Sequence, residues 1–226
     1  SPAGDLECLM SAVDYGCDAV YLGSTMFGMR AGAAKFDPET LRNGVEYAHA
    51  KGVRVYLTCN TVPSNDEIEL LPEFIKTAYD CGIDAAIVSD IGCIALIKRT
   101  VPDLEIHVST QAGVVNHVTA NELYKMGAKS VVLAREVDIE NIKRIRDNIP
   151  DDMDIEVFVH GAMCVSFSGR CLLSAFMTGR NANKGECAQP CRWKYHLVEE
   201  KRPGDYYELS VGDGGSYILN AKDMCM

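Results

Sequence analysis

The chain has 226 residues, and 47% of them are hydrophobic, which is enough to fill the core of one domain. No stretch reaches the roughly 20 consecutive apolar residues that a membrane-spanning helix needs, and no secretion signal opens the sequence, so we expect a cytoplasmic protein. The formal net charge of -10 argues against indiscriminate nucleic-acid binding, which normally needs a basic surface.

The first two thirds of the chain repeat one unit, a short apolar strand followed by an amphipathic helix. Asp37 and the proline after it predict the start of the first such helix, over 38–51. The predicted strands cover residues 18–23, 53–60, 85–89, 105–110, 130–134 and 155–160. The other predicted helices cover residues 65–81, 91–100, 117–126 and 138–148, the first of them capped by Asn65 or Asp66.

The predicted strands are apolar throughout rather than alternating, which is typical of parallel strands buried on both faces. Their regular spacing favours a closed (β/α) barrel, although an open doubly wound sheet remains an alternative. Six strands are two fewer than a full barrel has, and both ends of the chain fall within a βα unit. We therefore expect an α/β, TIM-barrel-like domain that is incomplete at both ends.

Nine of the ten cysteines fall into two groups, and the tenth is Cys225. Five are scattered, mostly through apolar stretches, where free cysteine packs as a small hydrophobic side chain. These are Cys8, Cys17, Cys59, Cys81 and Cys93. Four others lie in a short segment rich in glycine and arginine. These are Cys164, Cys171, Cys187 and Cys191. Clustered cysteines in a cytoplasmic chain indicate metal binding or catalysis rather than disulfides.

The four clustered cysteines suit either tetrahedral zinc or an iron–sulfur cluster. Arg170 and Arg192 favour the cluster, because neighbouring guanidinium groups would offset its negative charge. Zinc sites usually present two C-x2-C pairs, which this segment lacks. Zinc and reactive or structural thiols remain alternatives, and Cys225 is the substitute ligand if Cys191 does not bind.

Polar residues follow several predicted strands at their carboxyl ends, where parallel βα folds carry their chemistry. The candidate catalytic residues are Gln111, Arg135, His160 and Asn60. The candidate substrate-binding residues are His107, Asn116, Arg30, Arg170 and Arg192. For Asn116, and for Asp90 after another strand, helix capping is at least as good an explanation.

Residues 160–202 contain seven lysines and arginines but three acidic residues. This local positive charge indicates a phosphate- or carboxylate-facing patch, with chance clustering on a loop as the alternative. We expect three parts in the chain: a barrel-like domain over 1–161, a cysteine-rich cluster-binding segment over 162–198, and a hairpin with the start of a further barrel element over 199–226.

With these residues described, the chain resembles the collagenase-like peptidase family U-thirty-two over essentially its whole length. The shared phrases are Ser-Pro-Ala-Gly at 1–4, Ala-Val-Tyr-Leu-Gly at 19–23 and His-Val-Ser-Thr-Gln-Ala at 107–112. The most specific phrases are Glu-Val-Phe-Val-His-Gly-Ala-Met-Cys at 156–164 and Ser-Gly-Arg-Cys-Leu-Leu-Ser at 168–174. Gly-Glu-Cys-Ala-Gln-Pro-Cys-Arg-Trp at 185–193 is similar to the branch of the family that hydroxylates tRNA.

The resemblance implies a [4Fe–4S] cluster on the four clustered cysteines. It also implies oxygen-independent hydroxylation of a tRNA wobble uridine, with prephenate, a small dicarboxylate, as the source of oxygen. Related members hydroxylate ribosomal RNA or a quinone precursor, so these substrates are alternatives.

Two other functions remain open. The first is a metal-dependent, collagenase-like peptidase, although the sequence has neither His-Glu-x-x-His nor Gly-x-Ser-x-Gly. His160 and Cys164 resemble a Cys–His nucleophile pair, but that interpretation gives the other three clustered cysteines no role. The second is a non-catalytic cluster protein that senses redox state or assembles partners.

Overall fold

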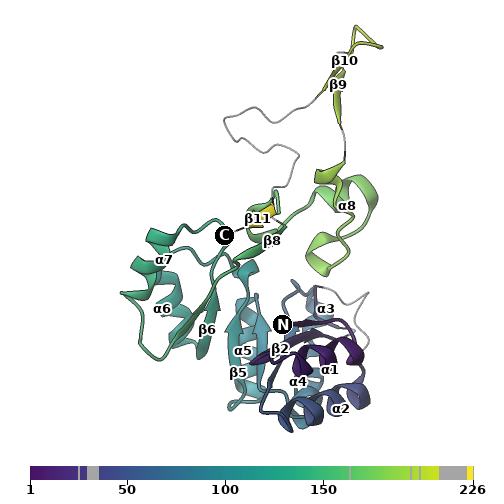
Figure 1. Cartoon of the computed structure of the whole chain (residues 1–226). Helices are drawn as coiled ribbons and strands as arrows, with labels where there is room; N and C mark the ends of the chain where they lie inside the picture. Colours follow the sequence, from purple (N-terminus) through teal and green to yellow (C-terminus); the bar gives the residue numbers. More distant parts are fainter. Residues whose placement is uncertain are drawn as a thin grey trace.

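A computed structural model describes residues 1–24, 26–29, 36–162, 164–193, 195–198, 200–208 and 223–225. Within these residues the main feature is a parallel sheet of seven strands whose spatial order equals their chain order (Figure 1). The strands are β1 (Pro2–Ala3), β2 (Ala19–Gly23), β3 (Arg54–Cys59), β4 (Ala85–Val88), β5 (Glu105–Val108), β6 (Ala128–Val132) and β7 (Asp154–Glu156). The α/β, TIM-barrel-like prediction is therefore confirmed.

Helices connect consecutive strands and cover one face of the sheet. They are α1 (Leu6–Asp14), α2 (Pro38–His49), α3 (Asn65–Ile68), α4 (Leu71–Asp80), α5 (Ile91–Thr100), α6 (His117–Lys125) and α7 (Ile139–Arg146). Asp37 caps α2 as predicted, because its carboxylate accepts the Thr40 N–H while the Thr40 hydroxyl accepts the Asp37 N–H. No helix in the described part of the chain is long and apolar enough to span a membrane.

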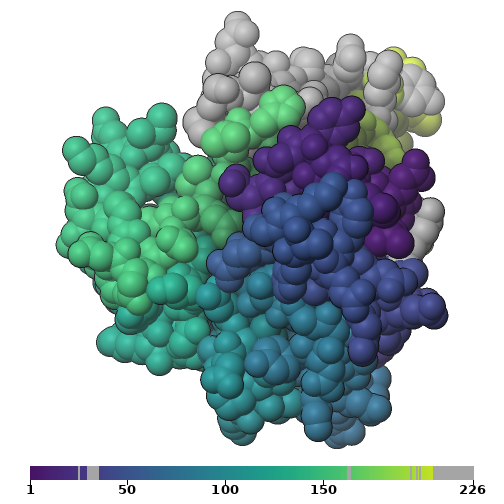
Figure 2. Space-filling view, turned by 60° about the horizontal axis from the view of Figure 1, so that its bottom comes forward, coloured from purple at the N-terminus to yellow at the C-terminus, as the bar shows by residue number. Residues whose placement is uncertain are grey.

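Burial alternates along β3 and identifies the two faces of the sheet. Val55 and Leu57 are fully buried against the helices. Tyr56 and Thr58, which alternate with them along the strand, are only half-buried. The second face is therefore the interior of a curved sheet. The Ser1 ammonium, beside β1, is the last of the groups that lower the pKa of Glu156 on β7, after His107 and Ser130. Figure 2 shows the purple and blue early residues and the teal and green later ones as adjoining lobes.

Three details differ from the prediction. Residues 2–3, which lie outside the predicted strands, form β1, which pairs in parallel with β2. The helix expected over 65–81 is two helices, α3 capped by Ser64 and α4. Pro72 explains the break, since it has no N–H to donate and its ring clashes with the carbonyl four residues earlier. The last strand ends at Glu156 rather than at residue 160.

The chain beyond β7 leaves the sheet. His160–Ala162 forms β8, which pairs antiparallel with β11 (Asp223–Cys225). Between them lie the 3-10 turns η2 (Phe167–Gly169), η3 (Ala182–Lys184) and η4 (Pro190–Arg192), the short helix α8 (Leu173–Thr178), and the antiparallel pair β9 (His196–Val198) and β10 (Tyr206–Glu208). In Figure 1 α8 and the β9–β10 pair stand apart from the sheet. The predicted division of the chain at residues 161 and 198 stays a prediction.

Candidate functional site

Two predicted catalytic residues, Asn60 and Gln111, meet at the carboxyl end of the sheet. Asn60 is the first residue after β3, and Gln111 lies in the 3-10 turn η1 (Thr110–Ala112) just after β5. The Asn60 Nδ2 donates to Gln111 Oε1 at 3.3 Å and to the Ser109 hydroxyl at 3.4 Å. The Ser109 hydroxyl also donates to Gln111 Oε1. The three side chains therefore form one hydrogen-bonded group, which we call the amide cluster.

The orientation of Asn60 in the amide cluster is fixed by its neighbours. Its Oδ1 accepts the Met29 backbone N–H at 3.1 Å, and its backbone carbonyl accepts the Ser89 hydroxyl at 2.9 Å. Because the carbonyl side of the amide is occupied, its Nδ2 is directed toward Gln111. A polar ligand at this mouth would meet donors and acceptors that are already oriented.

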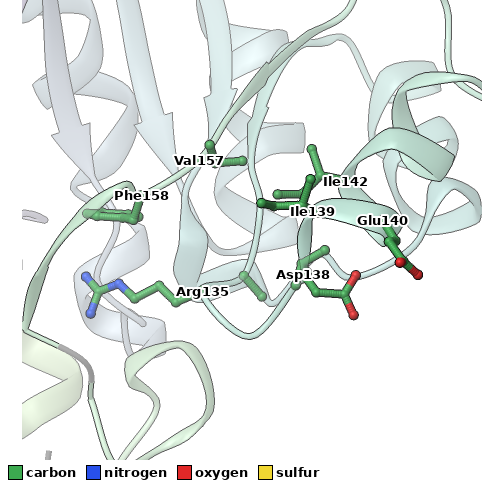
Figure 3. A pocket seen from close by; sticks show the side chains of 9 residues that line it. Arg135, Asp138, Ile139, Glu140, Ile142, Val157 and Phe158 are labelled. Atoms are coloured by element: carbon green, nitrogen blue, oxygen red, sulfur yellow. The ribbon is translucent and has the colours of Figure 1, made fainter. Parts of the chain in front are cut away.

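Arg135, the third predicted catalytic residue, lies at the neighbouring strand ends and lines a cavity of ≈560 Å³ (Figure 3). Its guanidinium carbon lies 4.3 Å from the centre of the Phe158 ring, a cation–π contact that orients the side chain. Figure 3 shows the guanidinium extending toward Phe158, on the side away from Asp138 and Glu140. The cavity therefore has a cationic end and an acidic end, separated by apolar side chains.

The cysteine-rich segment is attached to this mouth through η2. The Glu136 carboxylate accepts both the backbone N–H and the hydroxyl of Ser168, at 2.9 and 3.0 Å. Phe167 packs against Gly113, where an added Cβ would lie 3.2 Å from its ring. A Cβ on Gly169 would lie 3.8 Å from Gln111 Cγ. The residues just before Cys171 therefore lie beside the amide cluster.

A second attachment involves the residues around η3. Lys184 Nζ lies 2.6 Å from Glu67 Oε1, beside α3. The Asn183 side chain accepts the Cys171 N–H at 3.1 Å. Gly185 lies against the backbone of Met29 with a φ of 83°. The Lys184 ammonium, followed by the Ser64 N–H and hydroxyl, lowers the pKa of Glu67 from 4.5 to about 2.

The four clustered cysteines lie near one another. Burial is the main cause that raises the pKa of the Cys191 thiol, and the charges of Cys164, Cys187 and Cys171 raise it further. The Arg192 guanidinium acts in the opposite direction and lowers this pKa. Such neighbouring thiolates repel one another unless positive charge lies between them, so their chemistry fits a metal centre. Backbone N–H groups also donate to two sulfurs, Leu173 to Cys171 Sγ and Gln189 to Cys187 Sγ, each at 3.3 Å. Hydrogen bonds of this kind stabilise thiolate ligands.

Among the described residues, no three side chains of His, Cys, Asp or Glu are arranged to hold a metal ion. An iron–sulfur cluster keeps its thiolates further apart than one ion does, because iron and sulfide lie between them. A set of four thiols can hold either a zinc ion or an iron–sulfur cluster. The β8–β11 pairing also brings the Cys225 backbone opposite His160, four residues before Cys164. Cys225 thus stays open as the fourth ligand.

The scattered cysteines differ from the clustered ones. Cys59, Cys81 and Cys93 are buried, and burial raises the pKa of the Cys59 and Cys93 thiols, so both are neutral core side chains. Cys8 is exposed, so its prediction as a core residue is wrong. It lies in the first turn of α1, outside the face that packs on the sheet.

The remaining predicted residues lie elsewhere. His107 is buried inside the sheet, where its ring nitrogens lie 3.5 Å from the carboxylates of Glu105 and Glu156. The Asn116 side chain accepts the Thr119 N–H and caps α6, which supports the capping explanation. His160 is exposed on β8.

Arg170 and Arg192 are exposed on the cysteine-rich segment, and Arg30 lies outside the described residues. The substrate-binding roles of these residues stay predictions. The sequence did not single out Phe158 or Asn183 as site residues. Phe158 lies two residues beyond the end of β7, and this position near a strand end is a signal that could have found it.

The sequence matches the family model described as Peptidase family U32 over residues 4–226. An uncharacterized protease of Methanocaldococcus jannaschii is 44% identical, over 100% of this chain and 55% of its own length. A tRNA hydroxylation protein P of Helicobacter pylori is 41% identical, over 99% of this chain and 54% of its own length. A 23S rRNA 5-hydroxycytidine synthase of Escherichia coli is 36% identical, over 99% of this chain and 32% of its own length.

The chain thus spans about half the length of the first two relatives and 32% of the length of the third. Among solved structures, the U32 peptidase Mk0906 superimposes with a TM-score of 0.58 at 18% identity, over 70% of this chain and 67% of that one. This likeness supports the barrel-like fold. With a family model that covers nearly every residue, the chain belongs to Peptidase family U32.

Proposed function

We propose that this chain is the cluster-binding part of an iron–sulfur enzyme that hydroxylates RNA, with a tRNA wobble uridine as its substrate. The observation that carries the proposal is the attachment of the cysteine-rich segment to the mouth of the sheet. Ser168, just before Cys171, is hydrogen-bonded to Glu136, and Gly169 lies beside Gln111 of the amide cluster. Two relatives named for tRNA hydroxylation and for rRNA hydroxycytidine synthesis support RNA as the substrate class.

In this proposal Cys164, Cys171, Cys187 and Cys191 hold a [4Fe–4S] cluster. When bound, the cluster would supply one-electron transfer. Arg135 would bind a carboxylate of a small dicarboxylate co-substrate, proposed to be prephenate, in the cavity that it lines. Asn60 and Gln111 would orient a polar group of the substrate through their amides.

A peptidase function is the alternative, because one of the relatives, from Methanocaldococcus jannaschii, is named as a protease. The chemistry of the described site favours hydroxylation. The groups at the mouth are amides and a guanidinium, the attached segment carries the thiols, and the sequence has no His-Glu-x-x-His or Gly-x-Ser-x-Gly motif. The same chemistry would suit ribosomal RNA, and hydroxylation assays with both RNA classes distinguish the two substrates.

The proposal is tested by purifying the full-length protein without oxygen and measuring iron, sulfide and zinc per chain. We expect about four irons and four sulfides, and their loss in Cys171→Ala and Cys187→Ala. Cys8→Ala, which removes an exposed cysteine outside the segment, should keep the iron. Stoichiometric zinc, or no metal in a folded protein, would contradict the cluster.

Two further comparisons complete this test. The iron content of Cys191→Ala and Cys225→Ala identifies the fourth ligand, because the variant that lacks iron is the one in which a ligand has been replaced. Gln111→Ala should keep its iron but lose most of the hydroxylated nucleoside detected by mass spectrometry of digested RNA. Undiminished hydroxylation in that variant would show that the amide cluster has no part in the reaction.

A further inference from the structure

The cysteine-rich segment exposes an unusual number of large apolar side chains. Phe176 is 89% exposed, Leu172 is 75% exposed and Trp193 is 47% exposed. Phe167, beside the mouth of the sheet, is 54% exposed. Grouped apolar side chains on a surface mark a binding site more often than isolated ones do.

These side chains belong to one folded unit. Helix α8 packs against η4, and the Ser174 hydroxyl accepts the Ala188 N–H at 3.0 Å. The Tyr195 hydroxyl donates to Met177 Sδ at 3.4 Å. Phe176 and Trp193 are therefore carried by segments that pack together, while η2 links the same unit to the mouth of the sheet.

The charge around these side chains is positive in a chain that is acidic as a whole. Residues 164–193 contain Arg170, Arg180, Lys184 and Arg192, and Glu186 is their one acidic residue. All three arginines are exposed, whereas Lys184 is paired with Glu67. We call the arginines, together with Phe167, Leu172, Phe176 and Trp193, the aromatic–arginine patch.

We propose that the aromatic–arginine patch binds the unpaired nucleotides of an RNA loop, an inference that rests on the proposed function and names the surface that holds its substrate. Exposed aromatic rings stack on the faces of unpaired bases, and arginines contact the phosphates between them. A second copy of the chain is a poorer occupant, because a two-fold contact through this patch would bring arginines against arginines. Phe167 lies beside Gly113, which directly follows the turn that carries Gln111, so RNA held at Phe167 lies near the amide cluster.

The test measures binding of a fluorescein-labelled single-stranded oligouridylate to the full-length, iron-loaded protein without oxygen. Phe176→Ala should weaken binding about tenfold or more, the loss typical of removing one base-stacking side chain. Tyr15→Ala is the matched control, since Tyr15 is 93% exposed but lies at the end of α1. Trp193 is the only tryptophan in the chain, so RNA should also change its fluorescence.

Salt dependence tests the arginines separately. Arg180→Gln should weaken binding and reduce the slope of log affinity against log salt by about 0.7, the value for one contact to a single strand. Arg144→Gln, an exposed arginine on α7, should leave the slope unchanged.

The outcomes separate this inference from the proposed function. If the wild-type protein hydroxylates RNA but Phe176→Ala and Trp193→Ala bind the oligouridylate normally, the patch is not the RNA site and the proposed function stands. If Phe176→Ala instead converts a dimer to a monomer with unchanged RNA affinity, the patch is a protein interface and the inference fails. If the wild-type protein neither binds nor hydroxylates RNA, both proposals fail.

Discussion

At the scale of single residues, Glu67 and Lys184 join segments that are 117 residues apart in the chain. Lys184→Ala should raise the pKa of Glu67 from about 2 part of the way toward 4.5, because Ser64 continues to donate to the carboxylate. Carbon-13 NMR of the Glu67 carboxyl group during an acid titration measures this change. Lys125→Ala, which breaks a different surface pair with Glu122, should leave it unaltered.

The same pair predicts a pH dependence. Since folding lowers the pKa of Glu67, its contribution to stability is full above pH 4.5 and is lost as the pH falls toward 2. Both side chains are about 40% exposed, so we expect a contribution below about 1 kcal/mol. If the wild-type protein and Lys184→Ala differed equally in unfolding free energy at pH 7 and pH 2, the ion pair would not be the cause.

Gly185 shows how one residue positions the whole cysteine-rich segment. A Cβ at this residue would lie 2.2 Å from the Met29 carbonyl oxygen, and its φ is 83°. Gly185→Ala should therefore loosen the segment by about 2 kcal/mol or more, combining left-handed strain with a backbone clash. Hydrogen exchange of residues 181–193 measures the effect.

Gly179→Ala is the matched control for this variant. Gly179 has a similar φ of 73°, but nothing lies within 4 Å of its added Cβ. It should show the strain alone, about 1 kcal/mol. Equal exchange rates in the two variants would show that the contact with Met29 does not hold the segment in place.

At the scale of elements, the sequence predicted the features that local signals determine, namely the starts of several helices and the order of the strands. Asp37, Asp90, Asn116 and Asp138 each precede a helix and cap it, and the apolar strands between them form the sheet in order. The break between α3 and α4 differs from the prediction of one helix, and Pro72, in the first turn of α4, is the local signal for it. β1 was missed because two residues are too few to show a periodicity.

The candidate site was predictable only in part, for a related reason. Residues that follow adjacent strands must converge, and Asn60 and Gln111 do so. The contacts that attach the cysteine-rich segment join residues 32 and 117 positions apart, as in Glu136 with Ser168 and Glu67 with Lys184. No periodicity links such positions, because irregular turns rather than repeated helices and strands bring them together.

At the scale of the whole molecule, a charged network crosses the interior of the curved sheet from β3 to β7. Arg54 pairs with Glu105, His107 lies between Glu105 and Glu156, and the Ser130 hydroxyl donates to Glu156 at 2.9 Å. The His107 ring, only 6% exposed, packs edge-on against Tyr56 with ring centres 4.6 Å apart. Because the network joins strands from both halves of the sheet, its loss should weaken the sheet as a unit.

His107→Leu should therefore lower the free energy of unfolding by roughly 1–2 kcal/mol, because Glu105 and Glu156 lose the polar side chain that lies between them. His107 is the main cause that lowers the pKa of Glu156. The contribution of His107 to stability is therefore present above the ordinary carboxyl pKa and shrinks as the pH falls below it. Urea unfolding at pH 7 and at low pH measures both effects. His117→Leu, at the start of α6 and outside the network, is the control.

Comparing His107→Leu with Gly185→Ala tests whether the sheet and the cysteine-rich segment are stabilised separately. The interior network and the Gly185–Met29 contact share no residue. His107→Leu should therefore speed hydrogen exchange throughout β3–β6, whereas Gly185→Ala should speed it only in the segment. Faster exchange of β3–β6 in both variants would mean that the segment stabilises the sheet. Loss of a bound cluster would then destabilise the whole molecule rather than one loop.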